Sequence, residues 1–458
     1  MPVHLIDSLI YQNSWGTREL RVLFDDVPRT RSWLEILAML AEAQAAFGLI
    51  PQESAQDVAK TCRAIELDAP FFEEVRAGFE ATNHSTLGLI RAVQQRCPNQ
   101  SGEWVYYGAT VQDISDTWTM LVLQKVREIV KQELVAIEAN LVQLAATHRN
   151  TVMAGRTHGQ IGLPITFGFK AAGWAMEIRR HRQRLIEIAS RLNVGQLGGG
   201  VGSLSSLGPL ALDVQKHFLA KLGLNAPTIS WTTSRDTLAE WFNLLALIAS
   251  TGDKIGHEIY NLQRTEIGEV SEGFMEGTVG SITMPHKRNP EISEHLGTLA
   301  RVIRHDAALI LESQVHDHER DGRSWKAEWV VLAETCMATG KLLVLLRALT
   351  GNLDIHTERM RANLEATGGF VLSEAVMLAL AERVGKQSAH TLVYETAMQA
   401  HNAGHSFIQA VLDNPQIRTY LSAEEIEVLF DYRQHIGQCT TMVDQVLVEL
   451  GHTDAPTA

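Results

Sequence analysis

The side chains best suited to chemistry lie in one short stretch, residues 280–290, with the sequence GSITMPHKRNP. It offers the hydroxyl of Ser281, the ammonium of Lys287 and the amide of Asn289, and the carboxylate of Glu294 follows one turn later. Its two prolines exclude a continuous helix, because proline fixes φ and lacks an N–H donor. A loop with a potential base and a cation is expected to complete a site when it closes. An ordinary connection between helices is the alternative.

Two further stretches combine polar side chains with backbone breaks. Residues 108–113 (GATVQD) precede a long predicted helix, where hydroxyls and backbone N–H groups bind carboxylates or simply cap the helix. Residues 155–160 (GRTHGQ) place His158 beside a hydroxyl and an amide, and a histidine there can exchange a proton near neutral pH. His84 poses the same choice between a catalytic and an incidental loop histidine.

Two other polar or glycine-rich stretches are interpreted without a cofactor. Residues 198–203 (GGGVGS) follow a predicted helix and lack both GxGxxG and GK[ST], so tight packing or substrate access is favoured over nucleotide binding. Residues 316–319 (HDHE) contain metal-ligand types but no HExxH spacing, which favours a solvated or substrate-facing turn. We predict no metal site.

Apolar residues recur at helical spacing over most of the chain. In residues 116–148, for example, Leu123, Val126, Val130 and Leu134 lie three or four positions apart, with charged residues between them. The same pattern predicts further long helices at residues 166–192, 236–270, 290–313 and 327–349. Five long amphipathic helices with few β-rich runs predict an all-α bundle. Their wide apolar faces predict packing against other chains, and therefore an oligomer.

Three helical domains are predicted. They are an N-terminal domain at residues 1–110, a central bundle at residues 111–350 that carries the loop 280–290, and a C-terminal domain of shorter helices at residues 351–458. Gly351-Asn352 marks the second boundary, because both residues favour helix ends.

The composition limits the classes of partner and the compartment. A net charge of −13 argues against nucleic acid, although a local basic cluster can still bind an anionic substrate. The four cysteines are far apart, which fits a reducing cytoplasm without a disulfide framework. The first ten residues lack the pattern of a signal peptide, and apolar stretches such as residues 342–346 are too short to cross a membrane. We predict a cytoplasmic protein with no membrane partner.

Taken together, these stretches resemble the fumarase/aspartase superfamily over nearly the whole chain. Residues 280–290 match the signature G-S-x-x-M-P-x-K-x-N-P at all seven fixed positions, and residues 108–117 and 155–160 resemble the first and second conserved regions. At about one chance in twenty per position, such a match is highly specific. The resemblance implies a three-domain protomer whose five central helices form the twenty-helix core of a homotetramer. It also implies active sites built from three subunits, with no metal or organic cofactor.

The resemblance further implies anti-elimination across a Cα–Cβ bond of a succinyl group, which releases fumarate. Ser281 matches the base that removes the Cβ proton, and Lys287 and Asn289 match residues that hold the carboxylate next to the developing carbanion. His158 matches the general acid, and Glu294 matches its charge partner. This chemistry builds a dianion, which needs preplaced donors and positive charge. The substrate-binding positions implied are Thr110, Gln112, Thr157, Gln160, Asn289, Met284, Arg18, Arg235 and Arg320.

Signals for the branch of the superfamily are mixed. Residues 15–20 and 325–329 look like the 3-carboxy-cis,cis-muconate cycloisomerase branch, which typically has an aromatic residue where this chain has His158. His84 looks like the additional histidine of adenylosuccinate lyases, which implies a catalytic role for it, and residues 318–321 also look like that branch. However, Trp329 stands roughly where those lyases have a phosphate-binding arginine. We predict a C–N lyase that releases fumarate from an N-substituted aspartate. The alternatives are a carboxymuconate cycloisomerase, an adenylosuccinate lyase and an inactive helical scaffold.

Overall fold

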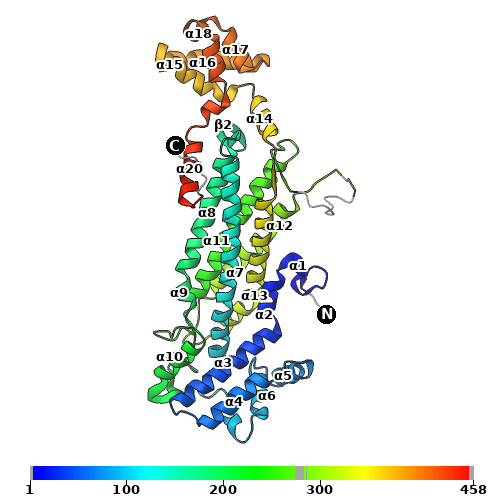
Figure 1. The fold of residues 1–458 in the computed structure, drawn as a ribbon, viewed down its shortest axis with the longest axis vertical. Coiled ribbons are helices and arrows are strands. Elements are labelled where there is room, and N and C mark those ends of the chain that lie inside the picture. The colour runs from blue at the N-terminus through cyan, green and yellow to red at the C-terminus, as the bar shows by residue number, and fades with distance from the viewer. Residues whose placement is uncertain (1–3, 274–282, 285, 453–458) are drawn as a thin grey trace. The chain divides into compact units, whose positions relative to one another are not determined.

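The chain forms an almost entirely helical fold in the computed structural model, which describes residues 4–273, 283–284 and 286–452 (Figure 1). The predicted all-α class is confirmed. The long helices are α7 (Val111–Thr147), α8 (Phe167–Glu187), α11 (Asp236–Gln263), α12 (Glu291–Glu312) and α13 (Gly322–Gly351). Helix α7 begins five residues before the predicted Asp116, and α11 ends before the predicted residue 270. In the second case, the turn from Arg264 to Gly268 (φ +62°) ends the helix.

The contacts between residues divide the chain into two compact units. Unit 1 comprises residues 1–132, 181–250 and 298–343, and unit 2 comprises residues 133–180, 251–297 and 344–458. Each unit combines three segments that are distant in sequence, and the boundaries between the segments fall within the five long helices. The three predicted domains remain a prediction.

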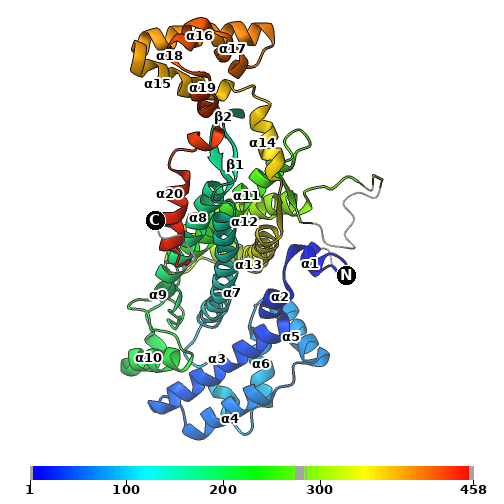
Figure 2. The same cartoon turned by 45° about the horizontal axis from the view of Figure 1, so that its top comes forward.

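Unit 1 contains a group of helices from the N-terminal part of the chain. Helices α3 to α6 lie together in Figures 1 and 2, and α5 and α6 approach each other closely at two glycines. A Cβ atom on Gly78 would lie 2.6 Å from the Cα atom of Gly88, so larger residues would separate the helices. The shorter elements of this unit are η1 (Leu5–Asp7), α1 (Gln12–Trp15), α2 (Arg18–Phe24), α3 (Asp26–Ala46), α4 (Gln52–Ala64), α5 (Ala69–Thr82), α6 (Leu87–Arg96), η2 (Ser101–Trp104), α9 (Ala189–Leu192), η3 (Ser205–Leu210) and α10 (Ala211–Lys221).

Unit 2 contains two short antiparallel strand pairs and the C-terminal helices. Strands β1 (Val152–Thr157) and β2 (Gln160–Thr166) form a hairpin where the sequence predicted only a break between helices. Strand β3 (Val270–Glu272) pairs with β4 (Leu353–Ile355). Phe407, Val376 and Ile426 belong to the buried core of the C-terminal helices. The elements that follow β4 are α14 (Thr357–Glu365), η4 (Phe370–Leu372), α15 (Ser373–Val384), α16 (Lys386–Ala403), α17 (Phe407–Asp413), α18 (Pro415–Tyr420), α19 (Ala423–Leu429), η5 (Tyr432–His435) and α20 (Cys439–Glu449).

Helix α13 is more apolar than the short run at residues 342–346 indicated. Among the described residues, α13 is the one unbroken helix that is long and apolar enough to cross a membrane. Its most apolar 18-residue window has a mean hydropathy of 1.6. Of that window, 56% is buried inside the protein, and buried core helices commonly have such composition. The predicted cytoplasmic location therefore remains a prediction.

Candidate functional site

Two residues that the sequence analysis predicted to bind substrate meet at the start of α7 in unit 1. The side chain of Arg320 donates a hydrogen bond from Nη1 to Oγ1 of Thr110, the residue immediately before the helix. Thr110 is buried, and Arg320 is half-buried. A helix N-terminus carries partial positive charge and free N–H groups, and a guanidinium adds a full charge. The structure thus brings together two residues that are 210 positions apart, both predicted to bind substrate.

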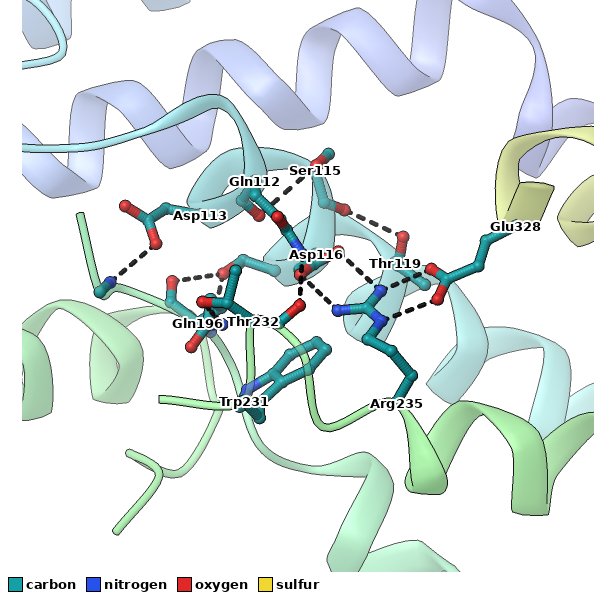
Figure 3. A network of polar contacts seen from close by, with 12 residues as sticks. Gln112, Asp113, Ser115, Asp116, Thr119, Gln196, Trp231, Thr232, Arg235 and Glu328 are labelled. Atoms are coloured by element: carbon teal, nitrogen blue, oxygen red, sulfur yellow. Dashed lines mark hydrogen bonds and ion pairs between the residues drawn. The ribbon is translucent and has the colours of Figure 1, made fainter. Parts of the chain in front are cut away.

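The buried carboxylate of Asp113 fixes this helix start to the glycine-rich segment (Figure 3). Its Oδ2 atom accepts the N–H groups of Thr110 at 2.8 Å and Gly199 at 3.1 Å, and its Oδ1 atom accepts the N–H of Gly198 at 2.7 Å. Gly199 has φ +70°, and a Cβ atom on Gly198 would lie 2.8 Å from Oγ of Ser230. The glycines are therefore needed for close packing and serve as backbone donors to a carboxylate of the protein itself.

Gln112 holds the loop that precedes α11. Its Nε2 atom donates to the carbonyl oxygen of Thr232 at 2.8 Å, and Gln196 donates to the hydroxyl of the same threonine at 3.1 Å. Both glutamines are buried. The amide nitrogen of Gln112 thus has a protein partner, and its predicted contact with substrate remains a prediction.

Arg235 lies at the centre of a buried ion triad with Asp116 and Glu328 (Figure 3). Its Nη1 and Nη2 atoms donate to Asp116 at 2.7 and 3.0 Å, and its Nε and Nη2 atoms donate to Glu328 at 2.7 and 2.5 Å. The arginine is 2% exposed and lies over the ring of Trp231. Two protein carboxylates thus occupy the guanidinium, which joins α7, α13 and the start of α11. Its predicted role in substrate binding stays a prediction, and the contacts give it a structural one.

The environment of Asp113 predicts a specific pH dependence of stability. Burial raises the pKa of Asp113 to about 6 despite its three N–H donors, from 3.8. A raised pKa in the folded state stabilises the fold below pH 4, and this contribution is lost as the pH rises through 6. We expect the free energy of unfolding of the wild type, relative to Asp113→Asn, to fall by on the order of 3 kcal/mol between pH 4 and 7. Urea unfolding at pH 4 and at pH 7 measures this difference. Asp354→Asn, at an exposed position of β4, is the control. If the wild type lost as much stability relative to Asp354→Asn as relative to Asp113→Asn, the pH dependence could not be attributed to Asp113.

In unit 2, His158 lies at the tip of the β1–β2 hairpin. His158 and Gly159 have φ values of +52° and +75°, as in the two-residue turns that join tightly twisted strands. Thr157 and Gln160 are directly paired across the tip, and all four residues are exposed. The predicted residues Thr157, His158 and Gln160 are therefore adjacent, with the imidazole accessible to a ligand.

A buried ion pair supports this hairpin. Arg156 donates from Nη1 and Nη2 to the two carboxylate oxygens of Glu269, at 2.9 and 2.6 Å, and Glu269 is fully buried. Asn363 donates to the same carboxylate at 2.8 Å. The sequence analysis did not identify this pair, whose partners are 113 residues apart.

The remaining predicted residues of unit 2 lie before or within the first turn of α12. Lys287 is exposed, and its backbone N–H bonds to the carbonyl of Met284, while Asn289 donates to Glu291 at 3.4 Å. Glu294 is exposed on the first turn. The predicted base, Ser281, lies outside the described residues.

Glu272, which the sequence analysis did not single out, caps the first turn of α12. Its carboxylate accepts the N–H groups of Ile292 at 3.0 Å and Ser293 at 2.7 Å, and the hydroxyl of Ser293 at 2.6 Å. It thus fixes the end of β3 to the helix that follows the signature stretch.

Arg18 and His84 are both exposed in unit 1, at the start of α2 and between α5 and α6. Among the described residues, neither side chain is hydrogen-bonded to Thr110 or Arg320. Their predicted roles remain predictions.

Comparisons with protein families and with individual proteins agree on a lyase. The family model described as Lyase matches residues 11–304, and that described as Adenylosuccinate lyase C-terminus matches residues 369–446. The chain is 39% identical to the N-acetyl-S-(2-succino)cysteine lyase of Dickeya dadantii, over 98% of each chain. It is 41% identical to the enzyme of the same name from Enterococcus italicus, over 98% of this chain and 97% of the other. It is also 38% identical to the adenylosuccinate lyase of Methanothermobacter thermautotrophicus, over 95% and 97%.

Solved structures with the same fold include a lactonizing enzyme and a fumarate lyase. The 3-carboxy-cis,cis-muconate lactonizing enzyme of Pseudomonas putida has a TM-score of 0.90 and 31% identity, over 96% of this chain and 99% of the other. A fumarate lyase from Mesorhizobium sp. BNC1 has a TM-score of 0.88 and 32% identity, over 95% and 98%.

Proposed function

Because the chain belongs to the fumarase/aspartase superfamily of lyases, we propose that it releases fumarate from an N-substituted aspartate by anti-elimination. The observation that carries the proposal is the contact of Arg320 with Thr110 at the start of α7, which forms a site suited to one carboxylate of a succinyl group. The substrate is thus a small dicarboxylate carrying a leaving group. We further propose that the protein is a cytoplasmic homotetramer whose active sites combine residues of three subunits.

In the proposed reaction, Ser281 removes the Cβ proton and Lys287 and Asn289 stabilise the carboxylate that takes up the developing charge. The Cα–N bond then breaks and fumarate forms. His158 protonates the departing nitrogen, because an amine anion is a poor leaving group. Positioned proton transfer contributes about 10² to 10⁴ in rate, and each preplaced donor to the dianion contributes about 10² to 10³. His158 is exposed on its hairpin, which supports its proposed role as proton donor to a substrate that is also bound by residues of another protomer.

A second candidate has sulfur as the leaving atom. It is favoured by the two relatives that are 39% and 41% identical, because the name N-acetyl-S-(2-succino)cysteine lyase places the succinyl group on sulfur. A thiolate leaves more readily than an amine anion, so the same base and carboxylate contacts would suffice.

A panel of substrates distinguishes these candidates. The purified protein is incubated with N-substituted aspartates, S-(2-succino)cysteine derivatives and 3-carboxy-cis,cis-muconate, and fumarate or lactone formation is followed. Fumarate from the nitrogen compounds supports the first candidate, and fumarate from the sulfur compounds alone supports the second. Lactone formation without fumarate release would reject both in favour of a cycloisomerase.

Adenylosuccinate is expected to be a poor substrate. Trp329 is 44% exposed and packs edge-on against Trp325, with ring centroids 4.8 Å apart. By the resemblance, it stands roughly where adenylosuccinate lyases have a phosphate-binding arginine. An aromatic ring cannot replace a bidentate guanidinium toward phosphate. We expect kcat/KM for AMP release to be at least about a hundredfold below that for the best substrate of the panel. Efficient AMP release would contradict this assignment.

A further inference from the structure

An aromatic cavity of about 540 Å³ lies within unit 1. It is lined by residues of α2, α3, α5, α6, α7, α11 and α13. Eight of the described residues that line it are aromatic, including Trp33, Trp118, Trp325 and Trp329. The rings pack edge-on, with Trp33 and Trp118 centroids 6.4 Å apart. Its volume is in the range of small-molecule sites.

Most polar groups of the cavity wall already have protein partners. Asp116 and Glu328 are paired with Arg235, and the hydroxyl of Thr119 donates to a backbone carbonyl at 2.9 Å. By contrast, the indole N–H of Trp33 is buried and has no hydrogen-bond partner among the described residues. That N–H is closed off from the cavity as well as from solvent. The cavity therefore offers mainly aromatic and aliphatic walls, and most of its polar groups are already paired within the protein.

The cavity adjoins the carboxylate site along the chain in two places. Ser115 lines it and lies five residues after Thr110 on α7, which corresponds to about 7 Å along the helix axis. Trp325 lies five residues after Arg320. Both segments that form the contact of Arg320 with Thr110 therefore continue directly into the wall of the cavity.

We propose that this cavity binds the leaving group of the substrate, and that the leaving group carries an aromatic or similarly bulky apolar portion. The inference rests on the proposed release of fumarate, and it adds the chemical class of the substituent. Burial of a phenyl ring in the cavity should raise kcat/KM about tenfold to a hundredfold above that for a substrate with a small substituent.

The test compares N-benzylaspartate with N-methylaspartate, and binding of benzylamine with that of methylamine. We expect kcat/KM for the benzyl compound to be about ten- to a hundredfold higher in the wild type. Benzylamine should change the tryptophan fluorescence at saturable concentrations, because four of the nine tryptophans line the cavity. Ala333→Phe, which fills the cavity, should abolish the preference and weaken benzylamine binding at least tenfold. Ala77→Phe, the same change at an exposed position of α5 outside the cavity lining, is the matched control.

A second variant protects the test against misfolding of Ala333→Phe. Trp329→Ala removes a half-exposed ring of the wall and should reduce the benzyl preference by at least threefold without filling the cavity. Equal turnover of both aspartates, or preference for the small one, would overturn the inference while leaving fumarate release intact. If neither aspartate yields fumarate, the proposed C–N chemistry fails, and benzylamine binding decides about the cavity. Binding that Ala333→Phe weakens supports the cavity, and binding unaffected by it overturns the inference.

Discussion

Ser281→Ala is expected to lower kcat for fumarate release by about a thousandfold or more. The proposed reaction requires a base for a weakly acidic C–H proton, and alanine offers no proton acceptor. Loss of positioned proton transfer costs about 10² to 10⁴ in rate. The measurement is steady-state turnover of the best substrate, with KM determined separately, because a base acts in the transition state more than in binding.

The matched control is Ser388→Ala, a change of the same kind at an exposed position of α16. It should retain wild-type turnover, and both variants should keep the wild-type oligomeric state in size-exclusion chromatography with light scattering. Turnover of Ser281→Ala within tenfold of the wild type would remove this serine from the mechanism. Loss of the oligomer would instead show that the change acts on assembly.

Arg235→Met is expected to destabilise the protein by about 3 to 5 kcal/mol. The change retains an unbranched side chain but leaves the carboxylates of Asp116 and Glu328 buried without a cation, and breaking a buried ion pair in this way costs about that much. Burial already raises the pKa of Glu328, so removal of the guanidinium should favour its protonation further. Urea unfolding at neutral pH measures the loss.

Arg191→Met is the matched control, because Arg191 also forms a double hydrogen bond with a glutamate, Glu240, but both side chains are more than two-fifths exposed. Such an exposed pair contributes about 0 to 1 kcal/mol. A loss of similar size in both variants would show that burial does not determine the importance of the triad. Replacing all three members of the triad by apolar residues should recover much of the stability, because no charge then remains buried.

Local sequence patterns identified the helices and much of the chemistry. The apolar periodicity of residues 116–148 and 290–313 predicted α7 and α12 nearly to their ends, because each amphipathic helix must bury one face. The seven matched positions of residues 280–290 identified the superfamily, and the family comparisons confirm it. Thr110 and Arg320 were predicted separately as substrate-binding residues on the same resemblance.

Only the tertiary structure showed which of these residues have partners. The sequence could not show that Asp113 is held by glycines some 85 residues away, that Arg156 pairs with Glu269, or that the predicted break at His158 is a hairpin. Arg235 was predicted to bind substrate, and the structure shows that it is paired with two carboxylates 119 and 93 positions away. A charged residue is rarely buried unless it is paired in this way. Helical periodicity depends on neighbours three and four residues apart, whereas these pairings depend on how distant segments pack. The sequence by itself therefore determined the long helices and the family, and packing decided which charged side chains are paired inside the protein.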